Sequence, residues 1–244
     1  MNAFERLRQG EPVFGLFLTY PAAQVAETAI WCGLDFVILD CEHGVVDESA
    51  QMEVLRTVCG SDAFVLVRTR AGDSSAVARY LDFGADGVLV PDVRTRAQAE
   101  EIAFAAHKRW TGGLRGDRYG IAPRAAKSPL VMVLIESPEG VANADAILEL
   151  DGIDGAIVGT GDLSTQLGAP GDFSSPAFRD AVDVVERAAR SRNKVLGSKP
   201  EKHLPIAAAL ARGHRLFLIG RDMGLLKAKL SETLTAAKKD AGCA

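Results

Sequence analysis

The chain has 244 residues, of which 48% are hydrophobic and 25% are charged, with a formal net charge of −4. This length suits one α/β barrel domain, and the composition is that of a globular protein with a sizeable core. The acidic balance provides no basic footprint for nucleic acid, and no apolar run approaches the roughly 20 residues needed to span a membrane.

The amino terminus and the cysteines bear on the compartment. Residues 1–10 are polar and charged, unlike a secretory signal peptide. The cysteines show no CxxC spacing; they are Cys32, Cys41, Cys59 and Cys243. Isolated thiols of this kind are typical of a reducing compartment. We therefore expect a cytoplasmic protein that binds neither nucleic acid nor membrane.

Strand-like and helix-like runs alternate along the whole chain. The sequence predicts strands at residues 13–19, 36–41, 63–68, 87–91, 130–136, 155–159, 194–198 and 215–219. It predicts helices at residues 21–32, 48–59, 74–84, 95–108, 139–150, 176–192, 202–212 and 222–238. Gly33, Gly84 and Gly213 each follow a helical segment, as C-caps do, whereas Asp73 and Ser175 precede helices, as N-caps do.

The number of units predicts the fold. Eight strand–helix units favour a (β/α)8 TIM barrel that residues 1–244 form as a single domain. A doubly wound open sheet is the alternative, because alternation alone does not establish that the sheet closes. The regularity of the eight units favours closure.

One interval breaks this rhythm. The residues between His107 and Pro129 are rich in glycine and include Arg115, Arg118 and Arg124. Long loops in compact domains are usually functional or disordered. The arginines of the 111–124 segment would recognise an acidic acceptor or a CoA phosphate, or would face water; the sequence leaves these alternatives open.

Charged side chains follow four of the predicted strands. Asp40 and His43 follow the second strand, Arg68 ends the third, Glu136 ends the fifth and Asp162 follows the sixth. Parallel strands that are buried on both faces are continuous apolar runs. The carboxyl ends of barrel strands open onto one face, where catalytic groups collect. We therefore expect these side chains to meet in one pocket.

Glu136 and Asp162 are candidate metal ligands. Neighbouring strands lie about 4.8 Å apart, so carboxylates at two adjacent strand ends can share a cation. Oxygen donors with room for water and substrate favour Mg²⁺ or Mn²⁺. The turn formed by Gly159, Thr160 and Gly161 lets the backbone approach a ligand and present N–H groups to a substrate carboxylate. The structural alternative is that each acid caps or charges the first turn of a helix.

Arg68 is a candidate anion ligand, because a cation at the end of an apolar strand is costly without a partner. Its planar fork suits a substrate carboxylate, and the alternative is a structural salt bridge to Glu136 or Glu42. A carboxylate such as Asp40 near His43 can fix the imidazole tautomer and make an acid–base group that works near neutral pH.

Other reactive side chains fit less well. The remaining histidines lack comparable neighbours and receive no role; they are His107, His203 and His214. No cysteine has a plausible triad around it. Lys199 ends the seventh strand, but the metal pair offers a competing electron sink to a Schiff base.

Several motifs in the right order resemble the HpcH/HpaI family of class II, metal-dependent 2-oxo acid aldolases, of the 2-dehydro-3-deoxyglucarate aldolase type. The resemblance covers most of the chain. Its motifs are GLF at 15–17, LDFVILDCEHG at 34–44, VLVR at 65–68, GADGVLVP at 84–91, LIESPEG at 134–140 and GAIVGTGDLS at 155–164.

The resemblance implies a lyase that cleaves or forms an aldol of a 2-oxo acid through a pyruvate-type enolate. By this resemblance Glu136 and Asp162 hold the divalent metal, and Arg68 binds the oxo-acid carboxylate. Asp40 and His43 form the acid–base pair and work through a bound water. Members of the family form oligomers, so we expect a homo-oligomeric trimer or hexamer with the C-terminal helix, about residues 221–240, in the interface.

Two alternative functions remain open. The same scaffold resembles condensing enzymes that make citrate from oxaloacetate and acetyl-CoA in siderophore pathways. Thr160 stands where the family often has proline, and the 113–116 loop precedes Glu136 by fewer residues than expected, which bears on the acceptor side of the pocket. A non-catalytic binder of an oxo acid is the third hypothesis, although a binder would not need the base His43.

Overall fold

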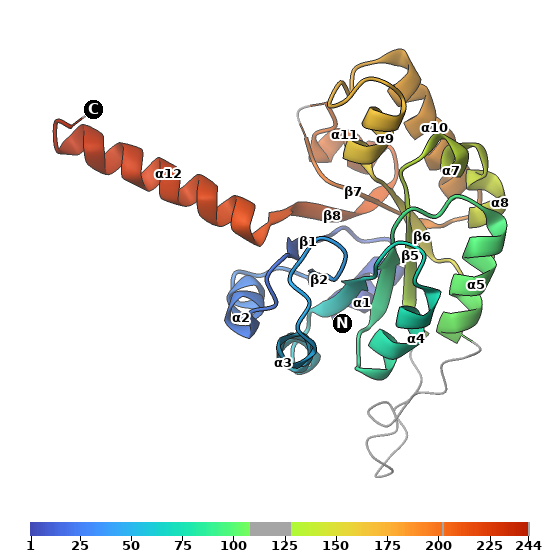
Figure 1. Cartoon of the computed structure of the whole chain (residues 1–244), viewed down its shortest axis with the longest axis horizontal. Helices are drawn as coiled ribbons and strands as arrows, with labels where there is room; N and C mark the ends of the chain where they lie inside the picture. Colours follow the sequence, from blue (N-terminus) through green and yellow to red (C-terminus); the bar gives the residue numbers. More distant parts are fainter. Residues whose placement is uncertain (108–127, 202, 244) are drawn as a thin grey trace, which may run out of the picture.

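Eight parallel strands close into a barrel in sequence order (Figure 1). The computed structural model describes residues 1–107, 128–201 and 203–243. The strands are β1 (Val13–Leu18), β2 (Phe36–Asp40), β3 (Phe64–Arg68), β4 (Gly87–Val90), β5 (Leu130–Ile135), β6 (Gly155–Val158), β7 (Val195–Ser198) and β8 (His214–Arg221). Because β8 pairs with β1, the predicted (β/α)8 TIM barrel is confirmed and the open sheet is excluded.

Helices surround the barrel and follow most strands. They are α1 (Ala3–Arg8), α2 (Ala23–Trp31), α3 (Glu48–Cys59), α4 (Ser74–Asp82), α5 (Arg96–His107), α7 (Pro138–Ala142), α8 (Ala144–Leu148), α9 (Thr160–Gln166), α10 (Pro176–Ser191), α11 (Ile206–Ala211) and α12 (Asp222–Asp240). The predicted N-caps are confirmed, because the side chains of Asp73 and Ser175 accept backbone N–H groups of α4 and α10. The three predicted C-cap glycines have φ angles of 88°, 98° and 96°.

Two short helices were not predicted. The first, α1, closes the amino end of the barrel, where Phe4 packs edge-on against Phe64 with ring centroids 5.6 Å apart. The second, α9, follows β6 directly. Both have fewer than eight residues, so neither presents enough turns for a clear helical period.

Two predicted helices have different bounds. The segment predicted as one helix at 139–150 is two helices, since Asn143 ends α7 and begins α8. The helix predicted at 202–212 begins only after Pro205, because the proline lacks the N–H that a helix interior requires.

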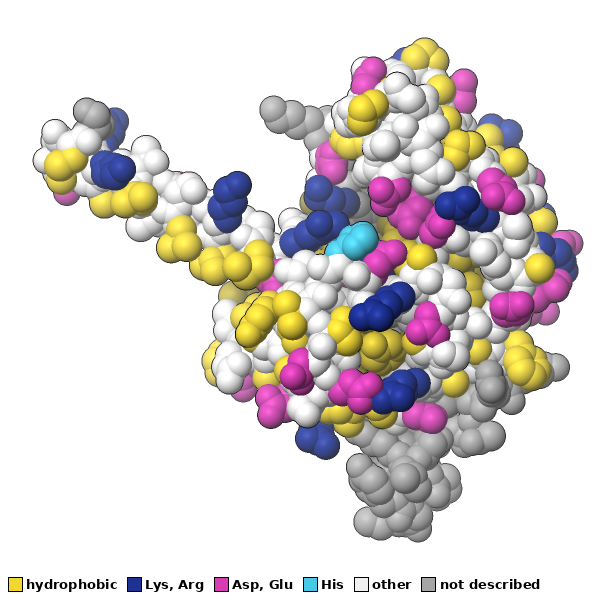
Figure 2. Space-filling view, viewed as in Figure 1, with side chains coloured by type: hydrophobic (Ala, Val, Ile, Leu, Met, Phe, Trp, Pro, Cys, Tyr) yellow, Lys and Arg dark blue, Asp and Glu magenta, His cyan; other side chains and the backbone are white. Residues whose placement is uncertain are grey.

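The last helix, α12, projects away from the barrel (Figure 1). Figure 2 shows hydrophobic side chains along it. The large apolar residues that it exposes are Met223, Leu225, Leu226, Leu230 and Leu234. Among the described helices, none combines the length and hydropathy that crossing a bilayer requires.

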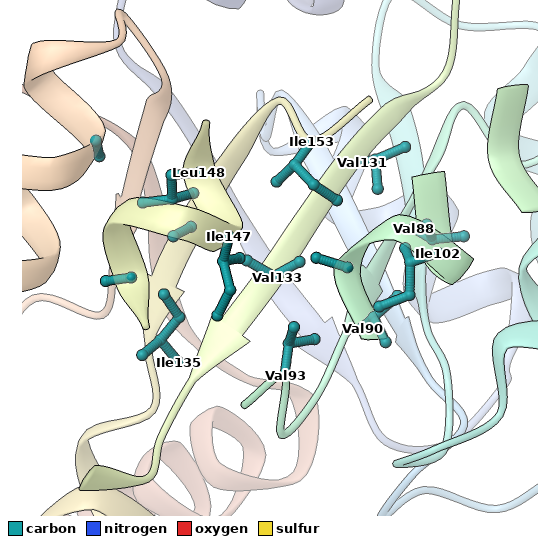
Figure 3. Packing of buried hydrophobic residues seen from close by; sticks show 14 of the residues in the cluster. Val88, Val90, Val93, Ile102, Val131, Val133, Ile135, Ile147, Leu148 and Ile153 are labelled. Carbon is teal, nitrogen blue, oxygen red and sulfur yellow. The ribbon is translucent and has the colours of Figure 1, made fainter. Parts of the chain in front are cut away.

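Side chains along β5 alternate between two hydrophobic clusters. Every second residue joins the cluster inside the barrel: Leu130, Met132 and Leu134. The residues between them pack outward against α5 and α8 (Figure 3): Val131, Val133 and Ile135. This burial on both faces explains the continuous apolar run. It also directs the next residue, Glu136, to the inside of the barrel.

Candidate active site

The two-residue period of the strands places three of the predicted site residues on the inside of the barrel. In β2 and β3 the residues two and four positions before the strand end lie in the inner cluster, as they do before Glu136. Asp40 and Arg68 therefore also point inward at the carboxyl ends of their strands. The register of β2 and β3 pairs Asp40 directly with Arg68.

Arg68 and Asp40 form a bidentate ion pair. Nε of Arg68 donates to Oδ1 of Asp40 at 2.8 Å, and Nη2 donates to Oδ2 at 2.6 Å. The Arg68 side chain is only 6% exposed. Burial raises the pKa of the Asp40 carboxyl, but the hydrogen bonds and charge of Arg68 lower it by more, so this pKa lies below its usual range. The pair fixes the plane of the guanidinium at the bottom of the site.

Glu42 is a site residue that the sequence analysis did not assign. Its Oε2 lies 3.1 Å from Nη1 of Arg68 and 3.7 Å from Nε2 of His43. Burial raises the pKa of the Glu42 carboxyl despite the charge of Arg68. The predicted structural alternative for Arg68, a salt bridge to Glu42, is thus present alongside the stronger pair with Asp40. The signal for Glu42 was its position two residues after Asp40, in the same loop.

His43 lies at the rim, with 60% of its side chain exposed. Oδ1 of Asp40 accepts the backbone N–H groups of Glu42 and His43, each at 3.1 Å. Within the described residues, the carboxylate beside the imidazole is therefore that of Glu42, and Asp40 acts on the loop backbone. Asp40 and His43 are neighbours, as expected, but through the main chain.

Glu136 is buried and held by backbone groups. Its Oε1 accepts the N–H of Asp92 at 2.9 Å, and Asp92 has a φ of 50° directly after β4. Burial raises the pKa of the Glu136 carboxyl to about 7; the N–H of Asp92 lowers it, and the charges of Asp162 and Glu42 raise it again. The neighbouring α7 is capped by Ser137. The alternative that Glu136 caps this helix is therefore not what the structure shows.

Gly159 makes room for the Glu136 side chain. A Cβ atom on Gly159 would lie 2.2 Å from Oε2 of Glu136, much closer than any real contact, whereas a Cβ on Gly161 would meet nothing within 4 Å. Gly159 is the N-cap of α9 without a side-chain cap, and Thr160 and Gly161 form its first turn. Asp162 also lies in this first turn, so it both charges the helix end and faces the site.

The acids at this end of the barrel outnumber the buried cation. Glu42, Glu136 and Asp162 raise one another's proton affinity through their charges, and Figure 2 shows acidic and basic side chains around a hollow in the face in view. In the described part of the chain, no three His, Cys, Asp or Glu side chains form a complete ligand set. The donor set therefore fits a hard cation such as Mg²⁺, which usually takes one or two carboxylates and keeps several waters.

The arginine-rich segment predicted to approach the site lies outside the described residues: Arg115, Arg118 and Arg124. Lys199 is exposed and pairs with Glu201 at 3.0 Å.

The family model for HpcH/HpaI aldolase/citrate lyase matches residues 13–226, which is nearly the whole barrel. The chain belongs to this family. As an HpcH/HpaI aldolase it is a carbon–carbon lyase, a member of a divalent-metal-dependent family that acts on small oxo acids and aldehydes. The resemblance inferred from its motifs is confirmed.

Named HpcH/HpaI relatives span nearly the full length of the chain. It is 32% identical to the 4-hydroxy-2-oxovalerate aldolase of Rhodococcus jostii, over 97% of this chain and 95% of that protein. It is 31% identical to the 2-keto-3-deoxy-L-rhamnonate aldolase of Klebsiella pneumoniae, over 98% and 94%. Among solved structures, citrate synthase SbnG matches with a TM-score of 0.88 at 27% identity, over 99% of both chains.

Proposed function

We propose that the protein catalyses reversible aldol cleavage of a 2-oxo acid through a pyruvate-type enolate. The observation that carries this proposal is the cluster of Glu42, Glu136 and Asp162 around one buried, bidentate-held Arg68. Such a site can hold a cation and a substrate carboxylate at the same place.

Glu136 and Asp162 would hold the divalent metal, Mg²⁺ or Mn²⁺. Their oxygen donors suit either ion, and Gly159 leaves the space that the Glu136 carboxylate occupies. When bound, the ion supplies a Lewis acid that stabilises negative charge on the substrate oxo group.

Arg68 would bind the substrate carboxylate. A guanidinium has five N–H groups, and three of them face Asp40 and Glu42. The remaining two are free for a substrate anion, and the backbone of Gly159, Thr160 and Gly161 supplies further N–H donors. Asp40 orients the guanidinium, so the carboxylate meets a preorganised fork.

His43 would move the proton. Its exposed imidazole can take a proton from C3 of the 2-oxo acid, directly or through a water, and return it in the reverse direction. Glu42 lies beside Nε2 and favours the protonated ring. Asp40 positions the loop by accepting the His43 backbone N–H.

The experiment that tests this proposal is proton NMR of pyruvate in D₂O with the purified protein. We expect the methyl signal to be lost in the presence of Mg²⁺ and to persist after EDTA. Persistence of the signal under both conditions would contradict the proposal.

A citrate-forming condensation is the second candidate, favoured by the likeness to citrate synthase SbnG. It would use the same Arg68 and carboxylates on oxaloacetate and acetyl-CoA. Release of the CoA thiol on mixing these two substrates, without exchange of pyruvate methyl protons, would favour this candidate over the aldolase.

We also propose that the protein is a homo-oligomer, trimer or hexamer, with the helix α12 at the interface. Its exposed leucines project from the barrel, and a contiguous apolar stripe of this kind is costly in water. A cytoplasmic location is proposed on its four free thiols.

A further inference from the structure

A cavity of about 210 Å³ lies on the outer side of the barrel wall. Its walls are formed by β6, β7 and β8 on one side and by α10 and the segment before it on the other. Leu196 packs in the outer cluster, and Ser198, two residues further along β7, points to the same side. The cavity is therefore separated by the strands from the inward-facing Glu136 and Arg68.

Two buried polar atoms that line this cavity have no hydrogen-bond partner in the described part of the chain. They are Oγ of Ser198 and Nδ1 of His214, in residues that are 7% and 3% exposed. Oε1 of Glu186 accepts Nε2 of His214 at 2.9 Å, which leaves Nδ1 as the ring nitrogen without a partner. Buried polar groups are nearly always hydrogen-bonded. Two such atoms in one cavity indicate a ligand with a polar group there.

The rest of the lining is apolar and basic. Phe173 and Phe178 provide aromatic surface, and none of the described lining residues is acidic. Arg212 is neutralised by Glu186 at 2.8 Å, and Lys199 by Glu201. Arg179 lines the cavity near the start of α10 and forms no ion pair within the described chain. An anionic group would therefore be favoured at the Arg179 end.

We propose that this cavity binds a hydroxylated aromatic carboxylate. The ring packs against the two phenylalanines, the carboxylate lies at Arg179, and the hydroxyl donates to Nδ1 of His214 or exchanges a hydrogen bond with Ser198. The size agrees, because a cavity of about 150 Å³ accommodates benzene and this one has room for the two substituents as well. Thr160 also lines the cavity, which places its mouth beside the proposed metal site.

The test is isothermal titration calorimetry of the full chain with 4-hydroxybenzoate. We expect saturable binding of one ligand per chain that persists in EDTA. We expect at least tenfold weaker binding of 4-methylbenzoate, which lacks the hydroxyl, and of 4-hydroxybenzamide, which lacks the charge. Absent saturation, loss of binding in EDTA or equal affinity for all three probes would each overturn the proposal.

Two variants of α10 locate the site. Val182→Phe adds bulk to the cavity wall and should weaken 4-hydroxybenzoate at least tenfold. Val184→Phe adds the same bulk to an exposed position of the same helix and should leave the affinity unchanged. If Val182→Phe does not fold, Ser198→Ala replaces it and should weaken the hydroxy acid but not 4-methylbenzoate. Unchanged binding of 4-hydroxybenzoate in the folded cavity variant would overturn the proposal.

Discussion

At the residue scale, Glu136 depends on neighbours that carry no charge of their own into the site. The N–H of Asp92 orients one carboxylate oxygen, and the missing side chain of Gly159 leaves room for the other. Partners that orient a metal ligand often matter nearly as much as the ligand, typically about 10–100-fold in affinity.

Gly159→Ala should therefore displace the Glu136 carboxylate. We expect Mn²⁺ affinity, measured by titration calorimetry, to fall about tenfold or more, as second-shell changes do. Gly161→Ala is the matched control, since its new methyl group meets open space. Equal affinities in the two variants would contradict the role of Gly159.

His43→Ala tests the base. Because the side chain is mostly exposed, we expect the melting temperature to be unchanged within error. Loss of a general base should slow pyruvate methyl exchange about 10²–10⁴-fold, while Mn²⁺ affinity stays constant. Parallel losses of exchange and metal affinity would show that His43 acts on the metal site rather than on the proton.

At the element scale, a buried charge cluster joins α10 to the start of β8. Glu186 is fully buried and accepts hydrogen bonds from Arg212 at 2.8 Å and His214 at 2.9 Å. Burial raises the pKa of the Glu186 carboxyl, but these two partners lower it by more, so the pKa lies below its usual value. Its contribution to stability is therefore present above the unfolded-state pKa of about 4.3. That contribution is lost as pH falls through the lower folded-state value.

Glu186→Gln should destabilise the barrel by about 3 kcal/mol at neutral pH, because it leaves buried cationic groups without their anion. The difference from the parent chain, measured by urea unfolding, should shrink as pH is lowered below about 4. Asp180→Asn on the exposed face of α10 is the control and should have little effect at any pH. A constant difference across the pH range would contradict the ionised state of Glu186.

At the scale of the whole molecule, α12 does not cover its own barrel. Asp222 anchors its first residue by accepting the N–H groups of Thr19 and Tyr20, each at 3.0 Å. The rest of the helix extends outward with its leucines exposed. A second chain is the partner that would bury them.

Leu226→Glu should weaken the proposed oligomer at least tenfold, because burying an unpaired charge in an apolar interface is costly. Size-exclusion chromatography with light scattering would show a lower mass. Ala228→Glu changes an exposed position on the other side of the helix and should keep the parent mass. A parent chain that is monomeric at micromolar concentration would rule out the interface.

The sequence by itself determined the barrel, most of its elements and the inward direction of Asp40, Arg68 and Glu136. Alternating burial has a period of two residues, and helix caps depend on side chains a few residues away, so both are written in short stretches of chain. The short α1 and α9 escaped because they contain too little of a period.

Only the tertiary structure decided which groups meet. Closure of the barrel sets β2 and β3 in a register that pairs Asp40 with Arg68, and brings the N–H of Asp92 and the bare Gly159 to Glu136. It also leaves Ser198 and His214 facing an outer cavity. These contacts join residues far apart in the chain, and their geometry depends on strand register and burial, which no local pattern encodes.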